Sequence, residues 1–308
     1  METENILGLA IGERSVQAAE IARTGASAAV TAIDDWENTL LGTGEQERIN
    51  GQRQFTEYLG AFLKVNRVKA FSASIALDTS FLFLHSFPCD EGASRADIQD
   101  DFLWEMKQLR PETDPKQFIT DVHKIQTPPP PGSPADTPPT QNTTCLGVAV
   151  PRAEIKVLSQ ILTGFGLKIN VIDADHFSAD IALRVNYPDT QRRNIALVGV
   201  KEHRVDVSIL REGNLESYRY HVVRSNQDIA EEIGRIARET RGVQSIVTYG
   251  PFLDRDLLVL IRRASPLLVE AMNPLRHVQV SDALRIAEHL SMPSYRFAAA
   301  VGVALRKD

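Results

Sequence analysis

The first 77 residues alternate between short apolar segments and one amphipathic segment. Residues 6–11 form an apolar run that Gly12 closes, and residues 16–21 show the alternation of a half-buried strand. Residues 28–33 can supply a third strand. Apolar residues then recur at helical spacing from Phe55 to Leu63, ahead of a short buried strand at 73–77. The pattern therefore predicts an antiparallel hairpin, a third strand, a crossover helix and a further strand.

From residue 81 the pattern changes. FLFLHSF at 81–87 predicts a strand, and Ser94 with Asp97 three residues later predicts the start of a helix that Pro111 stops. Two more strands are expected at 118–125 and 145–150. Between them, residues 127–140 hold seven of the sixteen prolines and form neither a helix nor a central strand. We expect a small α+β unit with a long proline-rich loop.

The remaining chain repeats the order of the N-terminus. After helix and strand signals at 153–186, three antiparallel strands are expected at 194–199, 205–210 and 215–223. Helices and strands then alternate up to residue 270, and 297–306 is a small-residue helix that we expect to pack on the first half. Such an order is that of a duplicated ribonuclease H-like fold with a cleft between its halves. The predicted division is 1–78 with 151–190 for the first half, 79–150 for the inserted domain, and 191–296 for the second half.

Composition and charge narrow the function. The formal net charge of -6 argues against nucleic acid as a partner. No apolar run reaches the roughly 18 residues that span a bilayer, and the two N-terminal glutamates argue against a signal peptide. Cys89 and Cys145 both fall in the inserted domain and can lie near one another, but buried thiols in a reducing cytoplasm are expected. The seven histidines lack ligand spacing, so no metal site is expected. Trp104 is expected in the core, with an interface anchor as the alternative.

Four segments carry a family resemblance. LGLAIGERSVQAAEI at 7–21 resembles the first phosphate hairpin of the actin-like nucleotide-binding superfamily, and within it that of the PilM proteins of type IV pilus assembly. FLWEMKQLRP at 102–111 resembles the helix of the small SHS2-type domain that these proteins share with FtsA. NVIDADHFSADIALRV at 170–185 is similar to the connecting helix, and AAAVGVALR at 298–306 is similar to the closing helix.

The nucleotide signatures of that family are eroded. Ala10 stands where the family has a metal-facing aspartate, and Lys201 stands where it has a glycine beside phosphate. The adenosine loop keeps only Gly250, followed by Pro251. We therefore expect a pseudo-ATPase with no catalytic residues, no metal and no required cofactor, with weak ATP or ADP binding left open. The degenerate cleft would be lined by Gly12, Glu13, Arg14, Ser15, Lys201, Glu202 and Gly250.

Two further features of the cleft stay open at this stage. Asp173 and Asp175 can supply carboxylates from the connecting segment, and Lys201 or Arg204 can attract phosphate by charge. Charged residues at hairpin tips are, however, expected to be solvated. An active actin-like ATPase or sugar kinase is the alternative function that these groups would support.

The resemblance implies a partner rather than a substrate. A PilM-like protein is expected to be a cytoplasmic scaffold, peripheral to the inner membrane, that binds the short cytoplasmic tail of a PilN-like inner-membrane protein. Self-association stays open, and no direct membrane insertion is expected. An extended tail would use the strand edges at 81–87 and 145–150, in a groove with Phe81, Phe83, His85, Leu146 and Val148. A GspL-like cytoplasmic domain of type II secretion and an FtsA-like filament former are the other interpretations.

Overall fold

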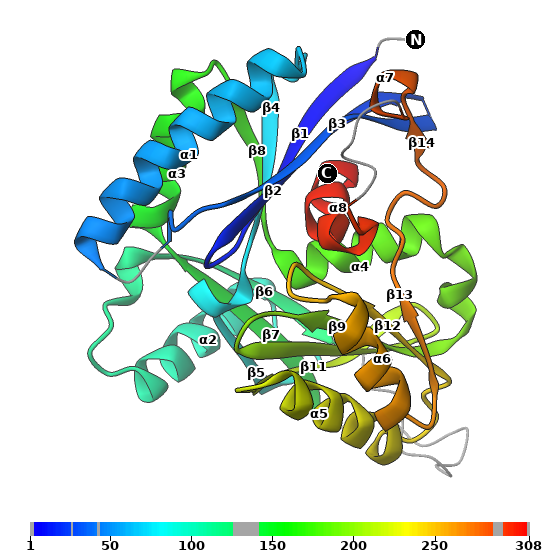
Figure 1. The fold of residues 1–308 in the computed structure, drawn as a ribbon. Helices are drawn as coiled ribbons and strands as arrows, with labels where there is room; N and C mark the ends of the chain where they lie inside the picture. Colours follow the sequence, from blue (N-terminus) through cyan, green and yellow to red (C-terminus); the bar gives the residue numbers. More distant parts are fainter. Residues whose placement is uncertain (1–2, 26, 42–43, 126–141, 286–291, 307–308) are drawn as a thin grey trace.

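The computed structural model describes residues 3–25, 27–41, 44–125, 142–285 and 292–306. The chain forms two lobes, each built on a mixed sheet, and a smaller unit with a three-stranded sheet (Figure 1). The predicted proline-rich loop at 127–140 lies outside the described residues. No helix in the described ranges is both long and apolar enough to cross a bilayer.

The first lobe is a six-stranded sheet in the order β14-β3-β2-β1-β4-β8. Its three antiparallel strands β1, β2 and β3 come first in the chain, and β4 and β8 extend the sheet in parallel to β1. The short β14 pairs with β3 and joins the sheet from within the segment 191–296. The strands are β1 (Glu4–Ile11), β2 (Ser15–Thr24), β3 (Ser27–Glu37), β4 (Ser72–Leu77), β8 (Lys168–Ala174) and β14 (Gln279–Val280).

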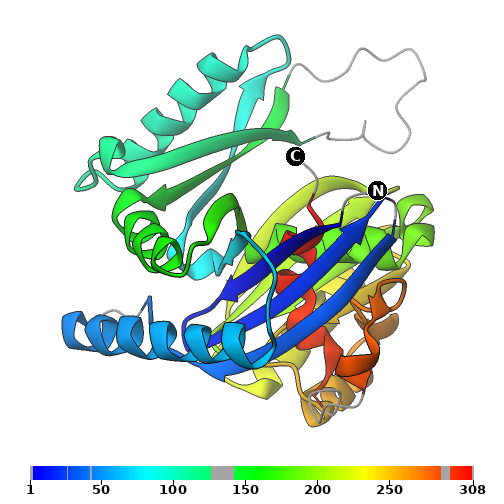
Figure 2. The same cartoon turned by 90° about the horizontal axis from the view of Figure 1, so that it is seen from above.

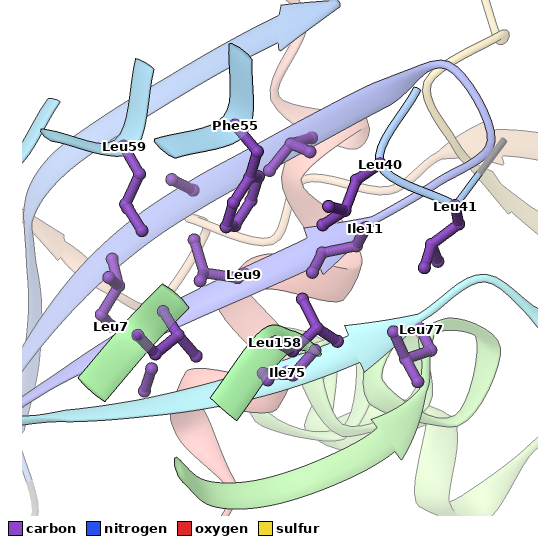
Figure 3. Packing of buried hydrophobic residues seen from close by; sticks show 14 of the residues in the cluster. Leu7, Leu9, Ile11, Leu40, Leu41, Phe55, Leu59, Ile75, Leu77 and Leu158 are labelled. Atoms are coloured by element: carbon purple, nitrogen blue, oxygen red, sulfur yellow. The ribbon is translucent and has the colours of Figure 1, made fainter. Parts of the chain in front are cut away.

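Strand alternation in β1 sends side chains to two different layers of helices. Leu7, Leu9 and Ile11 face α1 (Glu45–Val65) and α3 (Arg152–Gly164), where they pack with Phe55, Leu59 and Leu158 (Figure 3). The other face of the same sheet is covered by α8 (Ala298–Leu305), which also packs along α4 (Asp175–Asn186). Burial on both faces explains why residues 6–11 form a continuous apolar run.

The closing helix α8 can pack closely on β1 and α4 because small residues lie at both contacts. A Cβ atom on Gly8 of β1 would lie 2.0 Å from the carbonyl oxygen of Ala300, and one on Gly302 would lie 1.8 Å from that of Ser178. The backbones of β1, α8 and α4 therefore approach one another too closely for any side chain at these two positions. In the structure, α8 packs on the sheet of the first lobe.

The second lobe repeats the first. Its sheet has the order β11-β10-β9-β12-β13, with three antiparallel strands followed by two parallel ones. The repeat confirms the duplicated ribonuclease H-like fold. Its strands are β9 (Asn194–Val200), β10 (Arg204–Arg211), β11 (Asn214–Val222), β12 (Ser245–Tyr249) and β13 (Leu268–Ala271). Its helices are α5 (Asn226–Glu239) and α6 (Arg255–Ala264), whereas the short α7 (Asp282–Arg285) packs against β3 of the first lobe.

The inserted unit stands on one side of the two lobes (Figure 2). Its sheet has the order β5-β7-β6, with β5 (Phe83–Asp90), β6 (Phe118–Ile125) and β7 (Asn142–Pro151) all antiparallel. Helix α2 (Arg95–Leu109) covers one face, and Ser94 with Asp97 forms the predicted capping box. The opposite face packs through Leu146 and Ile125 on Tyr218 of the second lobe.

Two expectations for the inserted unit are wrong. Trp104 is 61% exposed, because the apolar stripe that α2 turns to the sheet consists of Ile98, Phe102 and Met106. Cys89 and Cys145 are joined in a disulfide, since their strands pair in a register that places the two side chains diagonally on the face toward α2. Both cysteines are buried, as expected, but they are not free thiols.

Candidate functional site

Three loops from the two lobes meet around one pocket of about 250 Å³. The turn between β1 and β2 contributes Gly12, Glu13 and Ser15, the turn between β9 and β10 contributes Lys201 and Glu202, and the loop after β12 contributes Pro251. The structure thus brings together residues from the three loops singled out in the sequence. Ala10 does not line this pocket, because its methyl group packs in the apolar layer under α8.

Two of the predicted cleft residues join the loops across the mouth. The Nη1 atom of Arg14 lies 3.0 Å from Oε1 of Glu202, in an ion pair whose arginine is exposed and whose glutamate is mostly buried. Gly250 adopts φ +132°, and a Cβ there would lie 2.2 Å from the carbonyl oxygen of Val200. The loop after β12 therefore packs directly on the end of β9, and glycine is required for this approach.

Lys201 is buried at the base of the pocket, where a solvated hairpin residue was expected. It is only 6% exposed, and its backbone N–H donates to the carbonyl oxygen of Arg204, closing the β9–β10 turn. The tight turn directs its side chain inward. Its Nζ atom lies 2.8 Å from Oδ1 of Asp78, 2.9 Å from Oδ2 of Asp175 and 2.9 Å from Oδ2 of Asp206.

The three aspartates come from three different parts of the fold. Asp78 follows β4, Asp175 begins α4, and Asp206 lies in β10. The hydroxyl of Thr79 completes the surroundings of the ammonium: Nζ donates to it over 2.6 Å, and it donates to Asp206 over 2.7 Å. We call Lys201, Asp78, Thr79, Asp175 and Asp206 the lysine cluster.

The pKa values of Asp175 and Asp206 shift in opposite directions. Burial raises the pKa of Asp175 to about 7, although Lys201 opposes the shift. Burial acts on Asp206 too, but Lys201 and Arg204 hold the pKa of that carboxyl well below its usual range. Asp206 differs because it accepts a hydrogen bond from Arg204 over 2.8 Å and one from the Tyr218 hydroxyl over 2.7 Å.

The charge of the cluster is close to balanced. Burial would lower the pKa of Lys201, but Asp175, Asp206 and Asp78 together raise it well above its ordinary value, so the ammonium stays charged. Three carboxylates face the two cations Lys201 and Arg204. A proton held on Asp175 near neutral pH removes the one excess negative charge.

A second buried group supports the cluster. The His176 ring has Nδ1 2.8 Å from the Tyr249 hydroxyl and Nε2 2.9 Å from Oγ of Ser208. Burial lowers the pKa of His176 to about 4, although Asp206 opposes the shift, so the ring is neutral at physiological pH. Gly199 leaves room for this contact, because a Cβ there would lie 2.7 Å from the Tyr249 hydroxyl.

Chemically, the lysine cluster is a cation site that already holds its cation. Four oxygen-bearing side chains converge at the distances of charge-assisted hydrogen bonds. Among the described residues, no open group of three or more acidic, histidine or cysteine side chains could hold a metal ion. Asp173, the other acidic candidate, points elsewhere and pairs with Arg306.

Sequence reasoning missed Asp78, Thr79 and Asp206 as parts of this site. One signal was present for Asp206, since a carboxylate inside the buried strand segment RVDVSILR requires a partner. For Asp78 and Thr79 the pattern shows only that a strand ends there.

The residues expected to form a partner groove do not share one surface. Strand alternation places Phe83 and His85 on the face of the inserted sheet that α2 covers, whereas Leu146 and Val148 point to the opposite face. Phe81 packs against the core of the first lobe.

One of the two expected strand edges is also not an edge. Residues 145–150 lie in β7, which pairs with β5 on one side and with β6 on the other. The order β5-β7-β6 leaves the outer edge of β5 without a neighbouring strand among the described residues. Of the two expected edges, only the one at 81–87 is therefore available for strand addition.

The chain resembles known proteins in its structure. No protein-family model matches the chain, and no curated protein matches it. The fold superposes on a chain of the "PilM-PilN type IV pilus biogenesis complex" with a TM-score of 0.77, 16% identity and coverage of 97% of both chains. The chain has the fold of PilM.

Two more distant structures share the same architecture. A Bacteroides thetaiotaomicron protein with an actin-like ATPase fold has a TM-score of 0.51 and 8% identity, over 88% of this chain and 91% of that one. The ethanolamine utilization protein EutJ from Carboxydothermus hydrogenoformans has a TM-score of 0.50 and 10% identity, over 99% and 90%. The PilM likeness and these two support the actin-like fold read from the sequence.

Proposed function

We propose that this chain is a non-catalytic scaffold that binds the short cytoplasmic segment of a PilN-like inner-membrane protein. The observation that carries the non-catalytic part is the position of the Lys201 ammonium between three aspartates. The partner is suggested by the PilM-like fold, since PilM occurs in a complex with PilN. The scaffold would work in the cytoplasm and be held at the inner membrane through its partner.

A bound lysine argues against metal-dependent phosphoryl transfer. Such chemistry needs carboxylates that are free to hold a divalent cation beside the transferred phosphate. Here the carboxylates of Asp78, Asp175 and Asp206 all pair with an ammonium group that is covalently part of the chain. The pocket keeps room for a small ligand, so weak nucleotide binding is compatible with the proposal, but no cofactor is required.

The non-catalytic part is tested by ATP turnover. The purified full chain, incubated with ATP and Mg²⁺, should release no phosphate above the background of the same reaction mixture without protein. Turnover near the enzyme median of about 10 per second would favour the alternative, an active actin-like ATPase or sugar kinase.

The free edge of β5 is the surface that best fits an extended tail. Pro88 lies in β5, and Pro151 lies in β7. Proline has no N–H to donate, so the nitrogen of Pro88 faces away from β7 and the nitrogen of Pro151 faces away from β6. Both prolines imply that odd-numbered β5 residues bond to β7. The N–H and C=O of Leu84 and Ser86 then point outward and can pair with an added strand.

Ser86 allows this edge to be tested without disturbing the sheet. Ser86→Pro removes one outward N–H, whereas the matched control Ser86→Ala keeps it. A synthetic peptide of the partner's cytoplasmic segment should bind the wild-type chain and the alanine variant with similar, micromolar affinity, about -8 kcal/mol. The proline variant should bind at least tenfold more weakly in calorimetric titration while keeping its circular dichroism.

Equal binding by both variants would place the tail away from the β5 edge. Absence of binding to the wild-type chain would contradict the scaffold proposal itself. These two outcomes separate the site from the function.

A further inference from the structure

The segment that joins α1 to β4 carries an unusual combination of side chains. Residues 64–71 read KVNRVKAF, with three basic residues set among apolar ones. Phe71 is 83% exposed and Val65 is 78% exposed, the two highest values among the exposed large hydrophobic residues of the described ranges. Single exposed apolar residues are ordinary, but these two lie six positions apart and are interleaved with cations.

The segment is a rigid turn. After α1 ends, Arg67 adopts φ +51°, and the Val68 N–H donates to the carbonyl oxygen of Leu63 over 3.0 Å. The backbone N–H groups of Lys69 and Ala70 both donate to Oε1 of the buried Glu20, over 2.6 and 3.0 Å. Val68 packs into the first-lobe core. The exposed side chains are thus presented by a backbone that is anchored on both sides.

The local charge is opposite to that of the whole chain. The formal net charge is -6, yet no acidic residue occurs between Glu57 and Asp78. Lys168 adds a fourth cation, because its backbone N–H donates to the carbonyl oxygen of Phe71 over 3.0 Å. Glu20 lies beneath the turn, where it is buried and accepts hydrogen bonds from backbone N–H groups, and the exposed Glu4 begins the neighbouring β1. We call Lys64, Val65, Arg67, Lys69, Phe71 and Lys168 the basic end.

We propose that the basic end docks on the surface of an anionic lipid bilayer. Cationic side chains are attracted to anionic headgroups, and exposed apolar side chains beside them can enter the boundary between headgroups and acyl chains. An acidic protein surface would attract the same cations, but it would need apolar pockets at the positions of Phe71 and Val65, whereas a bilayer has an apolar layer along its whole surface. The exposure of these two side chains therefore favours lipid over an acidic protein.

The position of the basic end is compatible with a second attachment elsewhere. Strand β4 begins at Ser72, next to the basic end, and ends at Leu77, where the chain enters the lysine cluster and then the inserted unit. Six strand residues span about 20 Å. The basic end and the inserted unit thus lie at opposite ends of β4, and the lipid proposal does not depend on the partner proposal.

Vesicle binding by the full chain tests the inference. Sedimentation with phosphatidylglycerol–phosphatidylcholine vesicles should show binding that weakens as salt is raised, and vesicles of phosphatidylcholine alone should show little. The triple variant Lys64→Gln, Arg67→Gln, Lys69→Gln should bind about a hundredfold more weakly, since each cation near an anionic surface contributes about fivefold. The control triple Arg53→Gln, Lys107→Gln, Arg241→Gln changes the net charge equally and should bind like the wild type.

The apolar contribution has its own pair of variants. Phe71→Ser should weaken vesicle binding severalfold, whereas Val222→Ser, at a residue 75% exposed in the second lobe, should not. Both variants should keep the wild-type melting temperature, because neither side chain is buried. Equal loss in the two triples, or no binding at low salt, would overturn the inference. The inference would also be overturned if polyglutamate bound as tightly as the anionic vesicles and if Phe71→Ser did not change that binding. This result would indicate an acidic protein partner instead.

Discussion

The Lys201 ammonium has three protons to donate and four oxygen-bearing side chains around it. Its interaction with the cluster is therefore as much a matter of charge as of individual hydrogen bonds. Removing one partner from a buried set of charges leaves the others uncompensated. The contribution of Lys201 is best seen by what its loss would leave behind.

Lys201→Met should destabilise the fold by about 3 to 5 kcal/mol, the range for breaking a buried ion pair. The methionine fills similar space but leaves Asp78, Asp175 and Asp206 facing one another. Urea unfolding measures the change in the free energy of unfolding. Adding Asp206→Asn to this variant should recover part of the loss; if the lysine variant alone is as stable as the wild type, the cluster does not hold the lobes together.

His176 should make stability depend on pH. Its pKa is about 4 in the fold and about 6.5 in the unfolded chain, so between these values the unfolded state binds the extra proton. The contribution of His176 is fully present above pH 6.5 and is lost as pH falls towards 4, by about 3 kcal/mol. Asp175 has the opposite effect on stability. Its pKa is raised to about 7 in the fold, so as pH falls below 7 the folded state binds a proton that the unfolded state does not, and this stabilises the fold.

Comparing wild type with His176→Asn separates these two effects, since Asp175 is common to both. The difference in unfolding free energy should shrink as pH falls from 7 to 4.5. A difference that is constant over this range would show that the ring is not the neutral, buried group described above.

At the scale of elements, the packing of α8 depends on two glycines. Gly302→Val should prevent α8 from approaching α4 and should lower the free energy of unfolding by several kcal/mol, because overpacking a core forces backbone shifts. The control is Gly164→Val at the end of α3, where no atom lies within 4 Å of an added Cβ. Thermal unfolding of the two variants should differ by more than 10 °C, and similar melting temperatures would contradict the close contact.

The inserted unit should lose stability on reduction. The disulfide closes a loop with a sequence separation of 56, for which the chain-entropy model gives about 4 kcal/mol. Unfolded protein without reductant should show no free thiol in a colorimetric assay, and two after reduction. Detection of two thiols before reduction would show that Cys89 and Cys145 are free thiols, as the sequence predicted.

Elements were more predictable than the site. The apolar run in β1, the alternation in β2 and the capping box at Ser94 depend on neighbours in sequence, so their elements could be located from the pattern. The lysine cluster could not, because Lys201 meets a residue 26 positions away and another 123 positions away. The expectation of a buried Trp104 failed for a related reason. The spacing of apolar residues identifies the buried face of α2, but how the helix packs on the sheet decides whether a residue at the border of that face is exposed.

At the scale of the molecule, the two ends of the described chain pack together in the first lobe. Residues from β1 and from α8 share one apolar layer, which includes Ile6, Phe297 and Val301. Deleting residues 298–308 should therefore abolish cooperative unfolding, whereas deleting 307–308 should leave it unchanged. Circular dichroism during thermal denaturation distinguishes the two, and a cooperative transition in the longer deletion would show that the first lobe is stable without α8.

The same layer has a consequence during synthesis. One face of the sheet that begins with residues 4–11 is covered by α8, so it cannot be covered until residues 298–305 have been synthesised. At about 5 to 20 residues per second, some 15 to 60 seconds separate the two ends. For that time the nascent chain presents an apolar strand surface at the ribosome, which makes the N-terminal sheet, although made first, a client for chaperones and among the last parts to reach its native packing.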